Sequence, residues 1–266
     1  MEQKRIGLIA AMPEEIRPLL KMAGKYTKEK IDRFDAYRFT HGNVKVLLVK
    51  SGMGLENAAS AANVLIKTLK PALIVNFGFC GGVKPGPQVG DIIVAHRILL
   101  NRDTLFSPQS GIVEEDAKLL SRSLADSLAD RGFTVYGGAF ITCADIKSKA
   151  EMARSIPSWA NNPVLEMETA AVALTAARGG VPFIALRVVT DDAGEELDFT
   201  IGELTDERMN IRIGKVLMAV ARKPRIIPQM LRLSKNSGRA GENLALAVVM
   251  LLEDTDDLTI KRERRH

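Results

Sequence analysis

Short apolar segments typical of strands alternate with longer helical patterns over most of this 266-residue sequence. An apolar strand is expected at residues 6–11, and Pro13 then begins a helix at the position where proline is best tolerated. In the helix expected after Gly54, the apolar residues form one continuous stripe. This alternation predicts an α/β fold, a single domain with a mixed central sheet flanked by helices.

The remaining elements follow from the same patterns. A hairpin is expected from residues 36–40 and 44–50 around Gly42 and Asn43. Further strands are expected at residues 72–77, 91–95, 135–143 and 182–190. Helices are expected at residues 118–131, 203–221, 228–233 and 242–252. Another helix is expected to begin at about residue 147, and an alanine-rich helix is expected to follow residues 166–168 and to end at residue 177.

Composition limits the class of protein. Hydrophobic residues make up 46% of the chain and charged residues 26%, which is ordinary for a soluble globular protein. Cys80 and Cys143 form no spaced cluster, so we expect buried free thiols and a reducing, cytoplasmic location rather than a metal centre. The N-terminus has no secretory pattern, and the longest apolar run, at 244–252, is far shorter than the roughly 20 residues of a membrane span.

The net charge of +5 is concentrated near the C-terminus, where residues 222–239 contain six basic side chains and no acidic one. The chain is therefore predicted to divide into a catalytic domain, 1–221, and a basic, partly apolar helical extension, 222–266. This extension is either a solvated helix face with a frayed tail or a contact with an anionic surface. Aromatic residues are only 5% of the chain, too few for a stacking platform, so no nucleic-acid partner is expected.

Three short acidic segments follow predicted strands, at Glu14-Glu15, at Glu166-Met167-Glu168 and at Asp191-Asp192. α/β sheets place their sites at such strand ends. Each acidic segment alone has an ordinary explanation, because acids favour the first turn of a helix and aspartates favour turns. The glycine-rich turn expected at 78–82 would let the backbone approach a ligand closely. Arg187 lies within an apolar strand, where its charge requires a partner.

Together, the order and types of these residues resemble the methylthioadenosine/S-adenosylhomocysteine nucleosidases of the nucleoside phosphorylase and nucleosidase superfamily. The resemblance covers about residues 5–221. Its landmarks are Ile-Gly-Leu-Ile-Ala-Ala-Met-Pro-Glu-Glu at 6–15, Ser-Gly-Met-Gly at 51–54, the segment 76–82, Val-Gly-Asp-Ile at 89–92, Glu-Met-Glu-Thr-Ala-Ala at 166–171 and Arg-Val-Val-Thr-Asp at 187–191.

The resemblance implies hydrolysis of an N-glycosidic bond without a cofactor or metal. Asp191 would protonate the purine and Glu15 would polarise the attacking water, as the two catalytic residues. Glu168 would bind the ribose hydroxyls and Arg187 would hold the acids in place. The other implied substrate-binding residues are Met12, Met53, Phe79, Ile146, Glu166 and Met167. The family also implies a homodimer, with the alanine-rich helix near the subunit contact.

Water is favoured over phosphate as the nucleophile because Glu14 and Glu15 would repel phosphate, although Arg17 is close in sequence. Phe79 and Asp145 depart from the nucleosidase pattern. The region of Asp145 and the basic extension are more similar to the hopanoid-associated branch, implied to remove adenine from an adenosyl lipid. The alternatives are therefore a purine nucleoside phosphorylase, an adenosyl-lipid enzyme with peripheral membrane contact through the extension, or a non-catalytic nucleoside-binding module.

Overall fold

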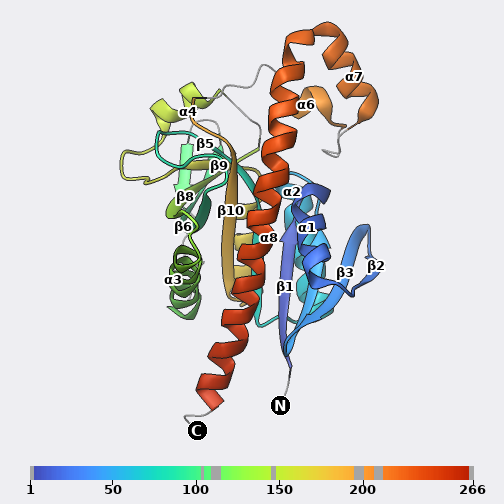
Figure 1. Ribbon diagram of the computed structural model, residues 1–266, viewed down its shortest axis with the longest axis vertical. Coiled ribbons are helices and arrows are strands. Elements are labelled where there is room, and N and C mark those ends of the chain that lie inside the picture. Colours follow the sequence, from blue (N-terminus) through green and yellow to red (C-terminus); the bar gives the residue numbers. More distant parts are fainter. Residues whose placement is uncertain are drawn as a thin grey trace.

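The computed structural model describes residues 3–102, 105–108, 115–144, 148–194, 201–206 and 212–263. It confirms the predicted fold class, a mixed central sheet flanked by helices and followed by a C-terminal helix (Figure 1). The strands are β1 Lys4–Ala10, β2 Thr27–Ile31, β3 Phe34–His41, β4 Val44–Lys50, β5 Leu73–Gly82, β6 Ile92–Arg102, β7 Leu105–Pro108, β8 Val135–Cys143, β9 Val164–Glu166 and β10 Phe183–Asp191. The helices are α1 Pro13–Ala23, α2 Leu55–Leu69, α3 Glu115–Asp130, α4 Lys149–Ser155, α5 Thr169–Arg178, α6 Ile201–Leu204, α7 Ile213–Arg222, the 3₁₀ turn η1 Pro224–Ile226 and α8 Ile227–Glu263.

The order of the strands brings the ends of the parallel strands together. β1 pairs in parallel with β4 and β5, and β5 pairs in parallel with β10. The carboxyl ends of these four strands therefore meet at one edge of the sheet, where α/β folds place their sites. β10 also pairs with β6, which continues through β8 and β9 back to β5, so these five strands form a closed ring.

Successive residues of the inner strands face two different cores, as expected from the two-residue period of a strand. In β1, Leu8 belongs to a core that also contains buried residues of α1, α3 and α8, whereas Ile9 belongs to a core with α2 and α5. Each side of the sheet is therefore covered by helices, and both predicted cysteines are buried and free.

Helix α8 differs from the prediction, because the two expected helical segments at 228–233 and 242–252 are parts of one continuous helix. The helix runs along the whole sheet (Figure 1). Asn236 donates to the backbone oxygen of Thr190 at the carboxyl end of β10, and Lys4 at the start of β1 lies 3.4 Å from the backbone oxygen of Thr255. Gly241 lets α8 approach α1, because an added Cβ would lie 3.0 Å from the backbone oxygen of Glu14.

The buried residues of α8 between 240 and 252 belong to the main core. The division of the chain at residue 221 stays a prediction. The helix expected at 203–221 is wrong in its extent, because α6 ends at Leu204 and α7 begins at Ile213. Within the part of the chain that the structure describes, no helix has the length and apolar character needed to cross a membrane.

Candidate active site

The centre of the site is the carboxyl end of β5, where the residues expected to form a glycine-rich turn continue the strand instead. The glycines here make room for charged side chains. A Cβ added to Gly78 would lie 2.6 Å from Oε1 of Glu15, and one added to Gly81 would lie 2.7 Å from Oδ2 of Asp191. Two acids from different parts of the sequence therefore stand over one strand, three residues apart along it.

Glu15 is held in the first turn of α1 by three backbone groups. Its Oε2 accepts the N–H groups of Ala11 and Met12 at 2.8 Å each, and its Oε1 accepts that of Phe79 at 2.9 Å. The side chain is buried, and this desolvation raises its pKa despite the three hydrogen bonds, which lower it. Glu14 is exposed, because adjacent residues of a helix face different directions, so only Glu15 of the predicted pair enters the site.

Arg187 is buried in β10 with 1% of its surface exposed, and it has the partners that the sequence required. Its Nη2 lies 2.7 Å from Oδ1 of Asn76, 2.8 Å from Oε2 of Glu166 and 2.8 Å from Oγ1 of Thr169. Its guanidinium also lies 5.7 Å from the centre of the Phe140 ring. The arginine is thus held in one position beside Glu166 and Glu168, and its charge also acts on Glu15; we call these three glutamates the acidic cluster.

Glu166, whose substrate contact stays a prediction, has several partners within the protein. Its Oε2 accepts the N–H of Glu168 at 2.9 Å and that of Thr169 at 2.8 Å, in addition to the Arg187 contact. Its Oε1 accepts the hydroxyl of Thr142. With so many partners, Glu166 holds the start of α5 and Arg187 in place.

Glu168 is the neighbouring carboxylate with fewer protein partners. Its Oε1 accepts the N–H of Gly54 at 2.8 Å, and Gly54 has a φ of +92°, a conformation that favours glycine. Its Oε2 is 4.0 Å from Nη2 of Arg187. Burial, and then the charge of Glu166, raise the pKa of Glu168 to about 8. The turn at residues 51–54 therefore contacts Glu168 through the Gly54 N–H.

Asp191, the last residue of β10, has a different environment from the two glutamates. Its Oδ1 accepts the Thr190 hydroxyl at 2.9 Å, and its Oδ2 lies 2.5 Å from Nζ of Lys149, a buried residue of α4. Lys149 was not predicted as a site residue from the sequence. The only signal was a lysine in the first turn of a predicted helix, and that position is normally exposed.

The remaining predicted residues surround this cluster unequally. Met53, which precedes Gly54 in the sequence, is buried, and so is Met167, which lies between Glu166 and Glu168 in the sequence. Met12 is half-buried at the start of α1. Phe79 belongs to the core that contains α8, and a Cβ on Gly241 would lie 3.8 Å from its Cζ. Ile146 lies outside the described residues.

The family-model comparison agrees with this arrangement. The model of the phosphorylase superfamily matches residues 5–222, so the chain belongs to this superfamily. Within it, the chain is 33% identical over 235 residues to a 5′-methylthioadenosine/S-adenosylhomocysteine nucleosidase of an Exiguobacterium species, covering 82% of this chain and 98% of that protein. A nucleosidase of the same name from Halalkalibacterium halodurans is 27% identical, with 81% and 97% coverage. The family resemblance seen in the sequence is confirmed.

Solved structures show the same fold. The 5′-methylthioadenosine/S-adenosylhomocysteine nucleosidase of Campylobacter jejuni superposes with a TM-score of 0.71 at 22% identity, covering 94% of this chain and 99% of that one. The futalosine hydrolase of Helicobacter pylori superposes with a TM-score of 0.72 at 17% identity, with 95% and 98% coverage. Each of these structures matches at least 94% of this chain, so the unmatched part is shorter than the 37 residues of α8. Part of α8 therefore belongs to the shared fold.

Proposed function

We propose that this protein hydrolyses the N-glycosidic bond of a 5′-substituted adenosine and releases adenine. The observation that carries the proposal is the placement of Glu15 and Asp191 over β5 beside the Arg187–Glu168 pair. The similarity to nucleosidases supports the same reaction class.

The chemistry suits the charges of the site. Cleavage builds positive charge on the ribose and negative charge on the departing base. Glu15, whose raised pKa makes it a good proton acceptor, takes a proton from the attacking water. Glu168 binds the ribose hydroxyls and stabilises the cationic sugar, with Met167 packed against the ring. Asp191 faces the base and passes a proton to it.

Water is favoured over phosphate because the cations at the site already have anionic partners. Arg187 is paired with Glu166, and Lys149 is paired with Asp191. Arg17, which could have supported phosphate binding, is exposed on α1. A phosphate would therefore find no cation without an anionic partner among the residues described at this site. The predicted repulsion then comes from Glu15, because Glu14 is exposed and the raised pKa of Glu168 favours its neutral form.

The test is turnover of a panel of adenosines with hydroxyl, methylthio, homocysteinyl and alkyl groups at the 5′ position, with adenine measured by chromatography. We expect adenine release from at least one member. Binding of the same nucleosides without turnover by the wild-type protein would instead support a non-catalytic binding module.

A lipid-linked adenosine is the second candidate substrate, favoured by an exposed apolar surface that we call the hairpin face. It consists of Ile213, Leu217 and Met218 on α7 and Ile227 and Leu231 on α8, which are 41–78% exposed. The opposite side of α7 and η1 has its own small core, with Leu204, Ala219 and Ile226 buried. Among the described residues, most of the hairpin face is therefore left outside this small core, as is typical of a contact surface.

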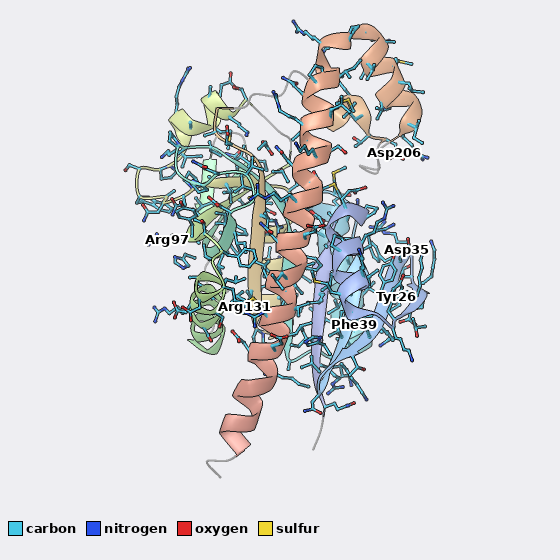
Figure 2. All side chains as sticks on the ribbon, in the orientation of Figure 1. Tyr26, Asp35, Phe39, Arg97, Arg131 and Asp206 are labelled. Atoms are coloured by element: carbon cyan, nitrogen blue, oxygen red, sulfur yellow. The ribbon has the colours of Figure 1, made fainter. Side chains whose placement is uncertain are left out.

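The hairpin face also has the charge and place expected of a membrane contact. Exposed basic residues flank it, namely Arg222, Arg225, Arg232 and Lys235. Since Asn236 meets the carboxyl end of β10, the residues of α8 before it extend beyond the edge that carries the site (Figure 1). Figure 2 labels Asp206 beside α6 and α7, above Asp35 and Tyr26 on the β2–β3 side. We propose that this face rests on an anionic membrane next to a lipid-linked substrate.

Vesicle sedimentation tests the membrane contact. Truncation after Ala221 would remove core residues of α8, so the test variant is Leu217→Gln with Leu231→Gln. We expect salt-sensitive binding to phosphatidylglycerol vesicles that this double variant loses. The control Met22→Gln, at an exposed position of α1, should bind normally. Absence of wild-type binding to these vesicles would reject the membrane contact.

We propose further that the protein is a cytoplasmic homodimer. Leu174 is 39% exposed on α5, the alanine-rich helix that the family resemblance places near the subunit contact. Its exposure on an otherwise largely buried helix supports a partner there. Light scattering after gel filtration should give the mass of two chains, and Leu174→Glu should shift it to one. A monomeric wild-type protein would contradict this.

A further inference from the structure

Asp191 is hydrogen-bonded as a carboxylate, although the proposed reaction asks it for a proton. One oxygen accepts the Thr190 hydroxyl at 2.9 Å and the other faces Nζ of Lys149 at 2.5 Å. An aspartate that forms an ion pair with an ammonium is a carboxylate, which accepts hydrogen bonds and has no proton of its own to give. The proton for the leaving base must therefore come from a neighbour, and among the described residues the ammonium of Lys149 is the charged donor in contact with Asp191.

Lys149 is built into the site. Lys149 is only 7% exposed, and its Nζ also donates to the backbone oxygens of Asp192 at 2.6 Å and Asp191 at 3.3 Å. Among the described residues, Nζ thus contacts one carboxylate and two backbone oxygens. Gly81 makes room for this pair, because a Cβ there would lie 2.7 Å from Oδ2 of Asp191 and 3.3 Å from Cε of Lys149.

We infer that Lys149 is the proton source for the leaving group and acts through Asp191. As the bond from C1′ to the base nitrogen breaks, its electron pair passes to the purine. Nζ of Lys149 gives a proton to the Asp191 carboxylate, and Asp191 passes a proton to the purine. The attacking water bonds to C1′ and gives its proton to Glu15. Lys149 then regains a proton from solvent and Glu15 releases one, so the cycle balances.

The backbone contacts fit both states of the lysine. A neutral amine has two N–H bonds, which is the number needed to keep the oxygens of Asp191 and Asp192 satisfied after the transfer. Lys149 therefore stays in position while its third proton moves. In this role it is a positioning and proton-supplying residue behind Asp191, and it needs no contact with the substrate.

The inference rests on the proposed cleavage reaction and is tested by changing the leaving group. Adenine needs a proton to leave, whereas 4-nitrophenolate leaves without one. Lys149→Met should lower turnover of the best adenosine substrate by about 10²-fold or more, the usual contribution of acid catalysis. The same variant should cleave 4-nitrophenyl riboside at close to the wild-type rate. Asp191→Asn should show the same selectivity, and Lys30→Met, an exposed lysine paired with Asp35, should lose neither activity.

A conservative substitution separates proton supply from a purely structural or electrostatic role. Lys149→Arg keeps the positive charge, but arginine does not release its proton in proteins. We expect this variant to remain as defective with adenosine substrates as Lys149→Met. Rescue by arginine, or an equal loss with both leaving groups in a normally folded Lys149→Met protein, would overturn the inference. If the wild type cleaves no adenosine derivative, the proposed substrate is wrong, and the comparison is made with whichever purine nucleoside it cleaves.

Discussion

The Nη2 atom of Arg187 lies 2.8 Å from Oε2 of Glu166 but 4.0 Å from Oε2 of Glu168. The arginine thus neutralises mainly one of two adjacent buried carboxyl groups. Glu166 also has hydrogen bonds from Thr142 and from two backbone N–H groups. Glu168 is left as the carboxyl that is costly to ionise.

The first prediction is a pH dependence of stability caused by Glu168. Burial and Glu166 raise the pKa of Glu168 from 4.5 to about 8 in the folded protein. A raised folded pKa gives stability that is fully present below 4.5 and is lost as the pH rises through 8. The free energy of unfolding in urea should therefore fall over this range, and more steeply in the wild type than in Glu168→Gln.

Asp35→Asn is the control for this measurement. The hydrogen bond and charge of Lys50 lower the pKa of Asp35, so its contribution is present above 3.8 and lost only at more acid pH. This variant should keep the wild-type slope between pH 4.5 and 8. Identical slopes for Glu168→Gln and the wild type would contradict the assignment to Glu168.

The second prediction concerns Arg187 as the charge that holds the acidic cluster together. Arg187→Met should lower the free energy of unfolding by about 3–5 kcal/mol, because it leaves Glu166 buried without its cation. Chemical denaturation measures this loss. The double variant Arg187→Met with Glu166→Gln should recover part of it, and a double variant less stable than Arg187→Met would count against the pairing.

The third prediction is that adding a methyl group to Gly78, which faces Glu15, lowers turnover, whereas adding one to Gly7, which faces Leu65, lowers stability. Gly78→Ala would place a Cβ 2.6 Å from Oε1 of Glu15, displacing the proposed base, and a misplacement of this size can lower turnover by about 10²-fold. Gly7→Ala would press on Leu65 in the core, 2.2 Å from its Cδ2, which should cost about 1–3 kcal/mol of stability. Steady-state turnover and thermal melting of both variants should show this division. Normal turnover in Gly78→Ala would mean that Glu15 does not act from this position.

The fourth prediction separates binding from chemistry at Asp191. Asparagine keeps the shape of the side chain but cannot relay a proton, so Asp191→Asn should lower turnover by about 10²–10⁴-fold with little change in nucleoside affinity. Calorimetric titration with a substrate analogue supplies the affinity. Glu168→Gln should damage both quantities, because its ribose contact would exist before and during the reaction. Near-normal turnover in Asp191→Asn would require activation of the base from elsewhere.

Much of the fold was predictable because its inner strands are apolar and its turns carry clear signals. β8 has the predicted bounds, and the hairpin of β3 and β4 was placed to within two residues. β2 was missed because its sequence, Thr-Lys-Glu-Lys-Ile, is exposed or half-buried along its length and has no apolar face to recognise. The continuity of α8 was also hidden, because Gly241 resembles a helix end in the sequence and is needed for contact with α1.

The acids of the site were predictable because they follow apolar strands, and Arg187 because a charge inside a strand needs a partner. The position of each acid relative to the others was not predictable. Glu14 and Glu15 are equivalent by residue type, and it was the family resemblance that selected Glu15; the direction of α1 explains why Glu15 is buried and Glu14 is exposed. Lys149 is buried because it meets Asp191, 42 residues further along the chain, and no local pattern reports such a contact.

The identity of the nucleophile is the claim on which the whole account depends. It is measured most directly by following adenine release with the best adenosine substrate in phosphate-free buffer and then with added phosphate, while the sugar product is identified by mass spectrometry. The arrangement of Glu15, Glu168 and the paired Arg187 predicts full turnover without phosphate and a free pentose as product in both buffers. Turnover that requires phosphate and yields a sugar 1-phosphate would contradict it.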